Sequence, residues 1–198
     1  MNTDDYFYEL SFDAATINAV KDAYNRFAKN TYVTDYSRTL YKDLKIKKIN
    51  DVLTENDILP TLVSFLSGTG INVSILPLAS SQIHIDQIDL IDSPGTSRNI
   101  AINFPIQMCN SVTSFYANPL ARTRDPLFHY SIAQYLKEPT PICSFHMGEQ
   151  AVLFNTRVFH SVKNLSSTET RTILSFSFDI KYSMFDCIEI MKRLGYAE

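Results

Sequence analysis

The sequence predicts a mainly β protein with flanking helices, of the jelly-roll type in which two β-sheets pack face to face. From residue 72 onward, short segments rich in Val, Ile, Phe and Thr alternate with Pro, Gly, Asn and Ser, the pattern of strands joined by turns. Eight such segments suit a jelly roll, whose paired sheets leave an open mouth for a ligand. Amphipathic patterns with helical spacing lie before and after this region.

The N-terminal part, residues 1–70, is predicted to be mainly helical. After Asp13, which can cap a helix, apolar side chains recur at steps of three and four residues. A second helix is predicted over residues 54–66 because Gly68 marks a stop, while Pro60 would move its start to a later residue. The apolar positions of the first helix are Ile17, Val20, Tyr24 and Phe27.

Residues 72–180 form the predicted jelly-roll core. Within it, the segment 117–141 is polar, basic and aromatic, so it is predicted to be an inserted flap over the pocket mouth, with room for some helix. A C-terminal helix is predicted over residues 183–195, closed by Gly195. The predicted strands cover residues 73–76, 82–86, 99–104, 112–116, 142–147, 151–154, 159–162 and 170–180.

Composition places the chain among ordinary globular proteins. A length of 198 residues without repeats or a linker predicts one domain, residues 1–198. The net charge of −3 argues against a nucleic-acid partner, because it gives no general attraction to phosphate backbones. Three widely spaced cysteines, no signal peptide and no long apolar run predict a soluble, cytoplasmic protein with no membrane contact. The sequence leaves the oligomeric state open.

The pattern His84-Ile85-Asp86 carries the first chemical signal. Strand residues two apart point to the same face, so this imidazole and this carboxylate can touch one ion. Two histidines and one carboxylate with open positions mark non-haem Fe(II) oxygenases. His160, in a second apolar segment, is the best candidate for the second histidine. The predicted catalytic and metal-binding residues are therefore His84, Asp86 and His160; the alternative is a surface strand with a polar face.

Arg171 follows His160 by eleven residues and opens the next predicted strand. A hairpin would bring its guanidinium beside the metal, where its planar fork suits the distal carboxylate of a dicarboxylate. A His-x-Asp triplet alone arises by chance roughly 0.3 times per chain of this length, whereas a later His with a properly spaced Arg lowers that to roughly 0.02. In the alternative reading, Arg171 pairs with Glu169 or Asp179.

Residues 84–86, 99–106, 154–156 and 160–164, followed by Arg171, resemble the 2-oxoglutarate/Fe(II)-dependent oxygenase superfamily. The resemblance covers about residues 72–180. The segment 160–164 with the downstream arginine is similar to the aspartyl/asparaginyl β-hydroxylase-like branch, which includes hydroxylases of free amino acids and of proteins.

This resemblance implies a double-stranded β-helix, the cupin-like form of the jelly roll. It implies Fe(II) bound by the two histidines and the aspartate, 2-oxoglutarate bound by Arg171, and O₂ as the oxidant. The implied reaction is hydroxylation of a C–H bond with release of succinate and CO₂. The implied substrate is an amino acid, a peptidyl side chain or a small metabolite, with a nucleobase last.

Two departures from the family pattern leave the second co-substrate contact open. The position two after the arginine is often a hydroxyl residue in the family, yet here it is Ile173, and the next inward position is Ser175. Ser175 and Arg98 are therefore candidate co-substrate contacts, Arg98 because it stands where the hydroxylase-like branch often has an Arg-x-His element. Asn103 and Tyr116 are further candidates, since a polar side chain inside a β core needs a hydrogen-bond partner.

The remaining histidines, His129 and His146, give weaker signals, and two alternative functions fit the same fold. His146 is predicted to be structural because no acidic residue lies two positions away. His129 lies in the flap, where aromatic packing and substrate contact are both open. The alternative functions are a catalytically silent jelly-roll binding module and a cupin-type metalloenzyme that does not use 2-oxoglutarate.

Overall fold

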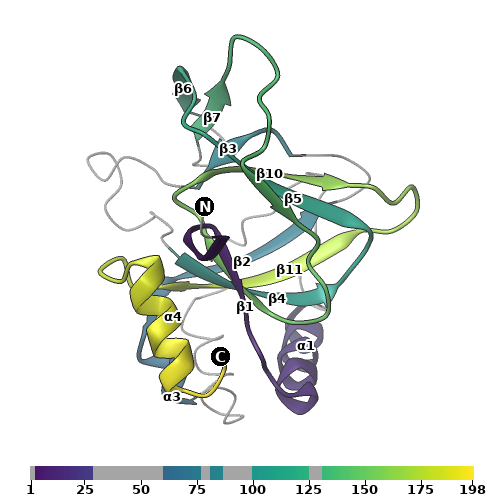
Figure 1. Cartoon of the computed structure of the whole chain (residues 1–198). Coiled ribbons are helices and arrows are strands. Elements are labelled where there is room, and N and C mark those ends of the chain that lie inside the picture. Colours follow the sequence, from purple (N-terminus) through teal and green to yellow (C-terminus); the bar gives the residue numbers. More distant parts are fainter. Residues whose placement is uncertain (1–2, 29–59, 77–80, 87–99, 125–130) are drawn as a thin grey trace.

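The computed structural model describes residues 3–28, 60–76, 81–86, 100–124 and 131–198. Two antiparallel sheets lie face to face, and helices pack at one end of them (Figure 1). The helices are η1 (Thr3–Asp5), α1 (Ala14–Ala28), α3 (Pro60–Val63) and α4 (Met184–Arg193). The strands are β1 (Phe7–Glu9), β2 (Leu66–Leu76), β3 (His84–Ile85), β4 (Ile100–Gln107), β5 (Ser111–Tyr116), β6 (Ala121–Arg124), β7 (Ser131–Gln134), β8 (Cys143–Phe145), β9 (Val152–Asn155), β10 (Phe159–Asn164) and β11 (Arg171–Phe178).

The strand order is that of a jelly roll. The five-stranded sheet has the order β1-β9-β4-β11-β2, and the six-stranded sheet has the order β6-β7-β3-β10-β5-β8. The chain crosses between the two sheets from β2 to β5 and again from β8 to β11, with each successive strand of these two runs in the other sheet, as when β10 leads through a turn into β11. The predicted fold class is confirmed.

Both faces of the five-stranded sheet contribute apolar side chains to a core cluster. Ile102, Phe104 and Phe176 are at most 1% exposed and belong to the larger core cluster, which includes residues of α1 and α4. The opposite face contributes Phe154 and Ile173 to a second cluster, which joins the two sheets. The other members of this inner cluster are Phe115, Phe145, Met147 and Val152. The space between the sheets is thus partly filled by aromatic rings, and the candidate functional residues lie beside them.

The predicted helix over residues 54–66 is wrong in its C-terminal part. Residues 54–59 of the predicted range lie outside the described residues. In the described part of that range, only α3 is helical. The chain enters β2 at Leu66 and continues in strand through Gly68, where a helix stop was expected. β2 pairs with β11 from Leu66, opposite Phe178, to Leu76, opposite Arg171. Hydrogen bonding of β2 to the interior strand β11 overrides the local glycine signal for a helix end.

The N-terminal part also contains a strand that the helical prediction missed. β1 pairs with β9, with Phe7 opposite Phe154, and extends the five-stranded sheet. The Phe7 ring stacks on Phe145 at a centroid distance of 4.2 Å. The first helix, predicted after Asp13, is present as α1. Asp13 Oδ1 accepts a hydrogen bond from the backbone N–H of Thr16, as expected of a helix cap.

The segment 117–141 forms strands rather than helix in its described residues. β6 and β7 pair with each other, and β7 pairs with β3, so the segment extends the six-stranded sheet beyond the strand that carries His84. This hairpin projects from the body of the protein in Figure 1. Backbone pairing with β3 explains why the segment is extended, although its composition broke the strand pattern. Its role as a flap stays a prediction.

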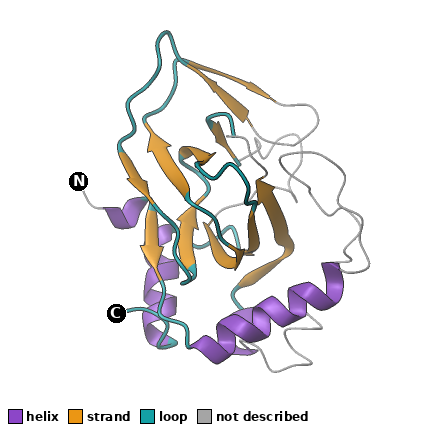
Figure 2. Cartoon of the chain, turned by 90° about the vertical axis from the view of Figure 1, so that its right-hand side faces the viewer, coloured by secondary structure: helices purple, strands orange, loops and turns teal. Residues whose placement is uncertain are grey.

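The C-terminal helix agrees with its prediction and begins with a capping box. The Ser183 side chain accepts from the backbone N–H of Asp186, and the Asp186 side chain accepts from the backbone N–H of Ser183. Its buried face includes Cys187, Ile190 and Met191. Figure 2 shows the longer helices at the lower end of the sheets. No helix in the described part of the chain is long and apolar enough to cross a membrane.

Loss of the cap should loosen this helix and the core cluster beneath it. We predict that Ser183→Ala lowers the free energy of unfolding by about 1 kcal/mol, because it leaves a backbone N–H of the first turn without its acceptor. Ser183→Thr keeps the hydroxyl and is the control. Urea denaturation of the three proteins measures the difference, and equal midpoints for the alanine and threonine variants would contradict it.

Candidate metal centre

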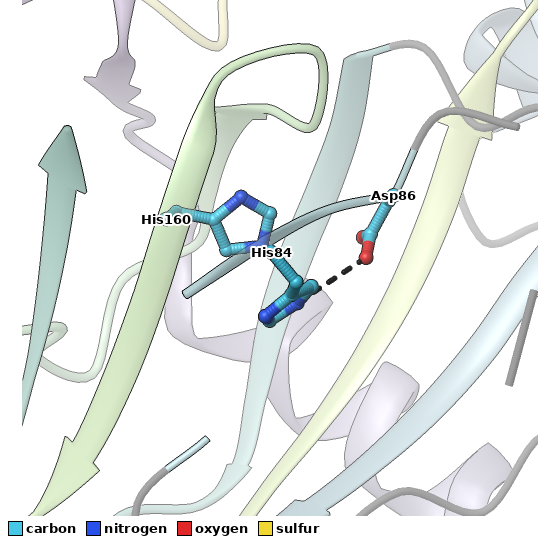
Figure 3. A group of neighbouring side chains, drawn as sticks. All are labelled: His84, Asp86 and His160. Atoms are coloured by element: carbon cyan, nitrogen blue, oxygen red, sulfur yellow. Dashed lines mark ion pairs between the residues drawn. The ribbon is translucent and has the colours of Figure 1, made fainter. Parts of the chain in front are cut away.

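His84 and Asp86 lie at the short strand β3, on the buried side of the six-stranded sheet. Their exposed fractions are 2% and 6%. Asp86 follows the last strand residue, and its backbone N–H donates to the carbonyl oxygen of Thr156 at 3.2 Å. The Nε2 of His84 lies 3.4 Å from Oδ1 of Asp86 (Figure 3). The two side chains therefore converge, as the alternation of a strand predicts.

His160 completes the group from the neighbouring strand β10. It is the residue directly opposite His84 in the antiparallel register, and it is 2% exposed. The two imidazole rings are 4.4 Å apart between centroids. One donor atom from each of His84, Asp86 and His160 lies within 4.8 Å of the other two. The structure brings together the three residues that were predicted to bind a metal.

Hydrogen bonds to the backbone fix both imidazoles in the same tautomer. His84 Nδ1 lies 2.7 Å from the carbonyl oxygen of Gln82, and His160 Nδ1 lies 2.8 Å from that of Val158. A carbonyl oxygen only accepts, so each Nδ1 carries a proton, and the neutral form of either ring would have its lone pair on Nε2. Histidine ligands in metalloproteins are commonly held in this way. Both rings are therefore prepared to bind through Nε2.

The donor set fits a divalent transition metal. Two imidazoles and one carboxylate, all buried, suit Fe(II) and similar ions in an octahedral arrangement that leaves other positions open. A buried carboxylate is stable as an anion only near positive charge or strong donors. A cation between the three side chains would supply that charge.

Arg171, the first residue of β11, is also buried and has weak partners. It is 4% exposed, its Nη2 donates to the Met147 sulfur at 3.6 Å, and its Nε has no hydrogen-bond partner. Burial lowers the pKa of Arg171 to about 10, because desolvation disfavours the charged form. The group is still protonated at neutral pH.

No carboxylate in the described residues pairs with Arg171. The alternative in which Arg171 pairs with Glu169 or Asp179 is therefore not found there. Asp179 pairs with Lys181 at 3.5 Å, and the Glu169 carboxylate accepts from Ser166 Oγ at 3.5 Å. A buried guanidinium without an anion is costly. The Arg171 site is thus suited to an anionic ligand.

Asn164 positions the turn between β10 and β11, a role that the sequence did not indicate. Its Nδ2 donates to the carbonyl oxygen of Glu169, and its Oδ1 accepts from the N–H of Ser166 and from the Cys109 thiol at 3.3 Å. These bonds close the turn directly before Arg171. An Asn inside a strand pattern gives no local signal of such a role, because the bonds depend on the hairpin.

The other predicted co-substrate residues have different outcomes. Ser175 and Asn103 lie opposite each other on β11 and β4, are buried, and share a short hydrogen bond in which Ser175 Oγ donates to Asn103 Oδ1. Ser175 lies on the same face of β11 as Ile173, which belongs to the inner cluster, so the pair is inside the jelly roll. Arg98 lies outside the described residues.

The prediction for Tyr116 is not supported by the register. On β5 the neighbouring residue Phe115 pairs with His160, so Tyr116 lies on the opposite face of the sheet. Its hydroxyl bonds to Ser161 Oγ at 3.1 Å on that face. The polar partner that Tyr116 needs is therefore another side chain of the sheet, away from the metal centre. His146 is exposed and outside the metal group, and His129 lies outside the described residues.

No protein-family model matches the sequence, and no curated protein matches it. Solved structures do match. The epimerase SnoN in complex with Fe3+, alpha ketoglutarate and nogalamycin RO aligns with a TM-score of 0.53 and 11% identity, over 92% of this chain and 85% of that chain. A second SnoN structure, described as a non-heme alpha ketoglutarate dependent epimerase from nogalamycin biosynthesis, aligns with a TM-score of 0.51 and 10% identity, over 88% and 78%.

HygX from Streptomyces hygroscopicus, with nickel and 2-oxoglutarate bound, aligns with a TM-score of 0.47 and 13% identity, over 91% of this chain and 85% of that chain. At such identities the similarity to SnoN shows the fold alone. The chain has the jelly-roll fold found in enzymes that use 2-oxoglutarate and iron.

Removal of any member of the triad should abolish tight metal binding. We predict that His84→Ala, Asp86→Ala and His160→Ala each weaken Mn(II) affinity by at least about 100-fold, since loss of groups that only orient ligands already costs about 10–100-fold. Isothermal titration calorimetry on the apo proteins measures this. His146→Ala is the matched control, because that histidine is exposed and should leave affinity unchanged. Retained affinity in all three triad variants would show that the site is misassigned.

Proposed function

We propose that this protein is a 2-oxoglutarate-dependent non-haem Fe(II) oxygenase. His84, Asp86 and His160 hold the iron, and Arg171 binds the distal carboxylate of 2-oxoglutarate. The observation that carries the proposal is the combination of a buried His-Asp-His group with a buried arginine that has no carboxylate partner among the described residues. SnoN, which has this fold, was solved with Fe3+ and alpha ketoglutarate, and this supports the same cofactors here.

Iron held by this group would supply, with 2-oxoglutarate and O₂, an oxidant for a substrate C–H bond, with succinate and CO₂ as the co-products. His84, Asp86 and His160 would hold the ion. Arg171 fixes the orientation of the co-substrate through a charge-assisted pair. Phe115 and Phe154 lie against His160, with ring centroids 6.2 and 4.8 Å away, and keep water from that side of the metal.

Hydroxylation of an amino acid, a peptidyl side chain or a small metabolite is the outcome that we propose. Because SnoN is described as an epimerase, the fold does not fix the reaction outcome, and the product itself has to be identified by mass spectrometry. Within the superfamily, the segment from His160 to Asn164 followed by Arg171 favours the aspartyl/asparaginyl β-hydroxylase-like branch. The hydrogen bonds of Asn164 give this segment a physical purpose, which is to set the turn before Arg171.

The two alternatives differ from this proposal at separate residues. A silent binding module needs neither the metal triad nor Arg171, and a cupin-type metalloenzyme needs only the triad. The buried Arg171 argues against both alternatives. In the proposed enzyme the co-substrate compensates its charge, whereas in a binding module or a cupin-type metalloenzyme no described group would do so. A test of Arg171 therefore separates the three functions.

We predict that Arg171→Ala weakens 2-oxoglutarate binding by on the order of 2–5 kcal/mol, because it removes a charge-assisted bidentate pair in a buried site. Arg171→Lys should restore only part of the affinity, since an ammonium group cannot reproduce the planar fork. The measurement is the dissociation constant of 2-oxoglutarate for the Mn(II)-loaded proteins. Melting temperature and Mn(II) affinity are the controls for folding and for the metal site. Unchanged affinity in a folded variant would remove 2-oxoglutarate from the mechanism.

A further inference from the structure

One row of cross-strand neighbours crosses the six-stranded sheet and includes both histidines of the metal centre. His160 is opposite His84, and His84 is in turn opposite Ile132 of β7. Ile132 is opposite Thr123 of β6. Residues directly opposite each other in an antiparallel pair project from the same face. Ile132 and Thr123 therefore lie on the face that carries the metal ligands, as does Gln134, two residues after Ile132.

This row passes from a buried to an open environment. His160 and His84 are each 2% exposed, Ile132 is half-buried, and Thr123 and Gln134 are exposed. The hairpin that carries the last three residues extends beyond the body of the protein (Figure 1). The face thus leads from solvent to the metal centre, a path that a substrate needs. We name Thr123, Ile132 and Gln134 the hairpin face.

The hairpin face offers a specific set of chemical groups. Gln134 Nε2 donates to Thr123 Oγ1 at 2.6 Å, which leaves Gln134 Oε1 as an acceptor and the Thr123 hydroxyl proton as a donor. The side chains described on this face of β6 and β7 are uncharged, since Arg122 is opposite Ala133 on the other face. Ile132, nearest to His84, offers an apolar contact.

We propose that the hairpin face is the substrate-binding surface of this enzyme, and that it takes an uncharged ligand with an amide group. The amide N–H donates to Gln134 Oε1, its carbonyl accepts from Thr123, and an aliphatic part of the ligand packs on Ile132 beside the metal. A carboxylate or ammonium group would find no opposite charge among the described side chains of the hairpin face. This inference rests on the proposed function, because it assigns the substrate class of the same site.

The test is succinate release by the Fe(II)-loaded protein in the presence of N-acetyl amino-acid amides, compared with the corresponding free amino acids. We expect the uncharged amides to raise the rate above the ligand-free rate and the free amino acids to give a smaller increase. If the free amino acids stimulate more strongly, or if no amide stimulates, the assigned substrate class is wrong.

Variants locate the effect on the hairpin face. Gln134→Ala should raise KM for the best amide by about tenfold with a smaller change in kcat, since it removes one hydrogen bond to the ligand. Arg122→Ala, on the other face of the same hairpin, is the matched control and should leave KM unchanged. Equal effects of the two variants would overturn the assignment.

The dissociation constant of 2-oxoglutarate for each Mn(II)-loaded protein separates the two proposals. Failure of the wild type to bind 2-oxoglutarate would refute the proposed function. Normal 2-oxoglutarate binding and normal ligand-free turnover, without a response to the amides, would refute only the substrate surface.

Discussion

The antiparallel pairing of β10 with β3 is the interaction on which the site depends. β3 has only two residues, yet it is held on one side by β10 and on the other by β7. This pairing places His84 opposite His160. The backbone carbonyl oxygens of Gln82 and Val158 accept from Nδ1 of the two rings and so select the same tautomer in both. A shift of one residue in this register would move His160 to the other face of the sheet and separate the ligands.

A second constraint is that the interior holds opposite charges at two separate places. Asp86 is buried beside two histidines, and Arg171 is buried beside the sulfur of Met147. Each charge is tolerated in a folded protein only when something compensates it. A cation at the first place and a dianion that reaches from the metal to the second would satisfy both. The stability of the protein and its proposed activity are therefore linked, because ligands that bind only the native state also stabilise it.

The sequence could predict what depends on local alternation and spacing, and it failed where long-range pairing decides. His84 and Asp86 were found because two residues of one strand share a face whatever the partner strands are. Tyr116 was misplaced because it adjoins Phe115, and two neighbouring aromatic residues do not indicate which one faces inward. The adjacency of Ile132 to His84 was also invisible, since it depends on which edge of the sheet the hairpin joins. The same reason explains why β1 and the start of β2 were missed.

The pairing of β2 with β11 has a consequence for how the molecule assembles. Leu66 is opposite Phe178 and Leu76 is opposite Arg171, so this edge of the five-stranded sheet forms only when segments far apart in the sequence meet. Contacts of this kind carry a large loop-closure entropy before any hydrogen bond forms, and they make folding slow. The candidate metal ligands His84 and His160 are also far apart in the sequence, so they meet only after β10 has been made. On a ribosome, the newly made β2 would therefore remain without its partner until β11 emerges, and the proposed metal would be acquired late, only after β10 has brought His160 to His84.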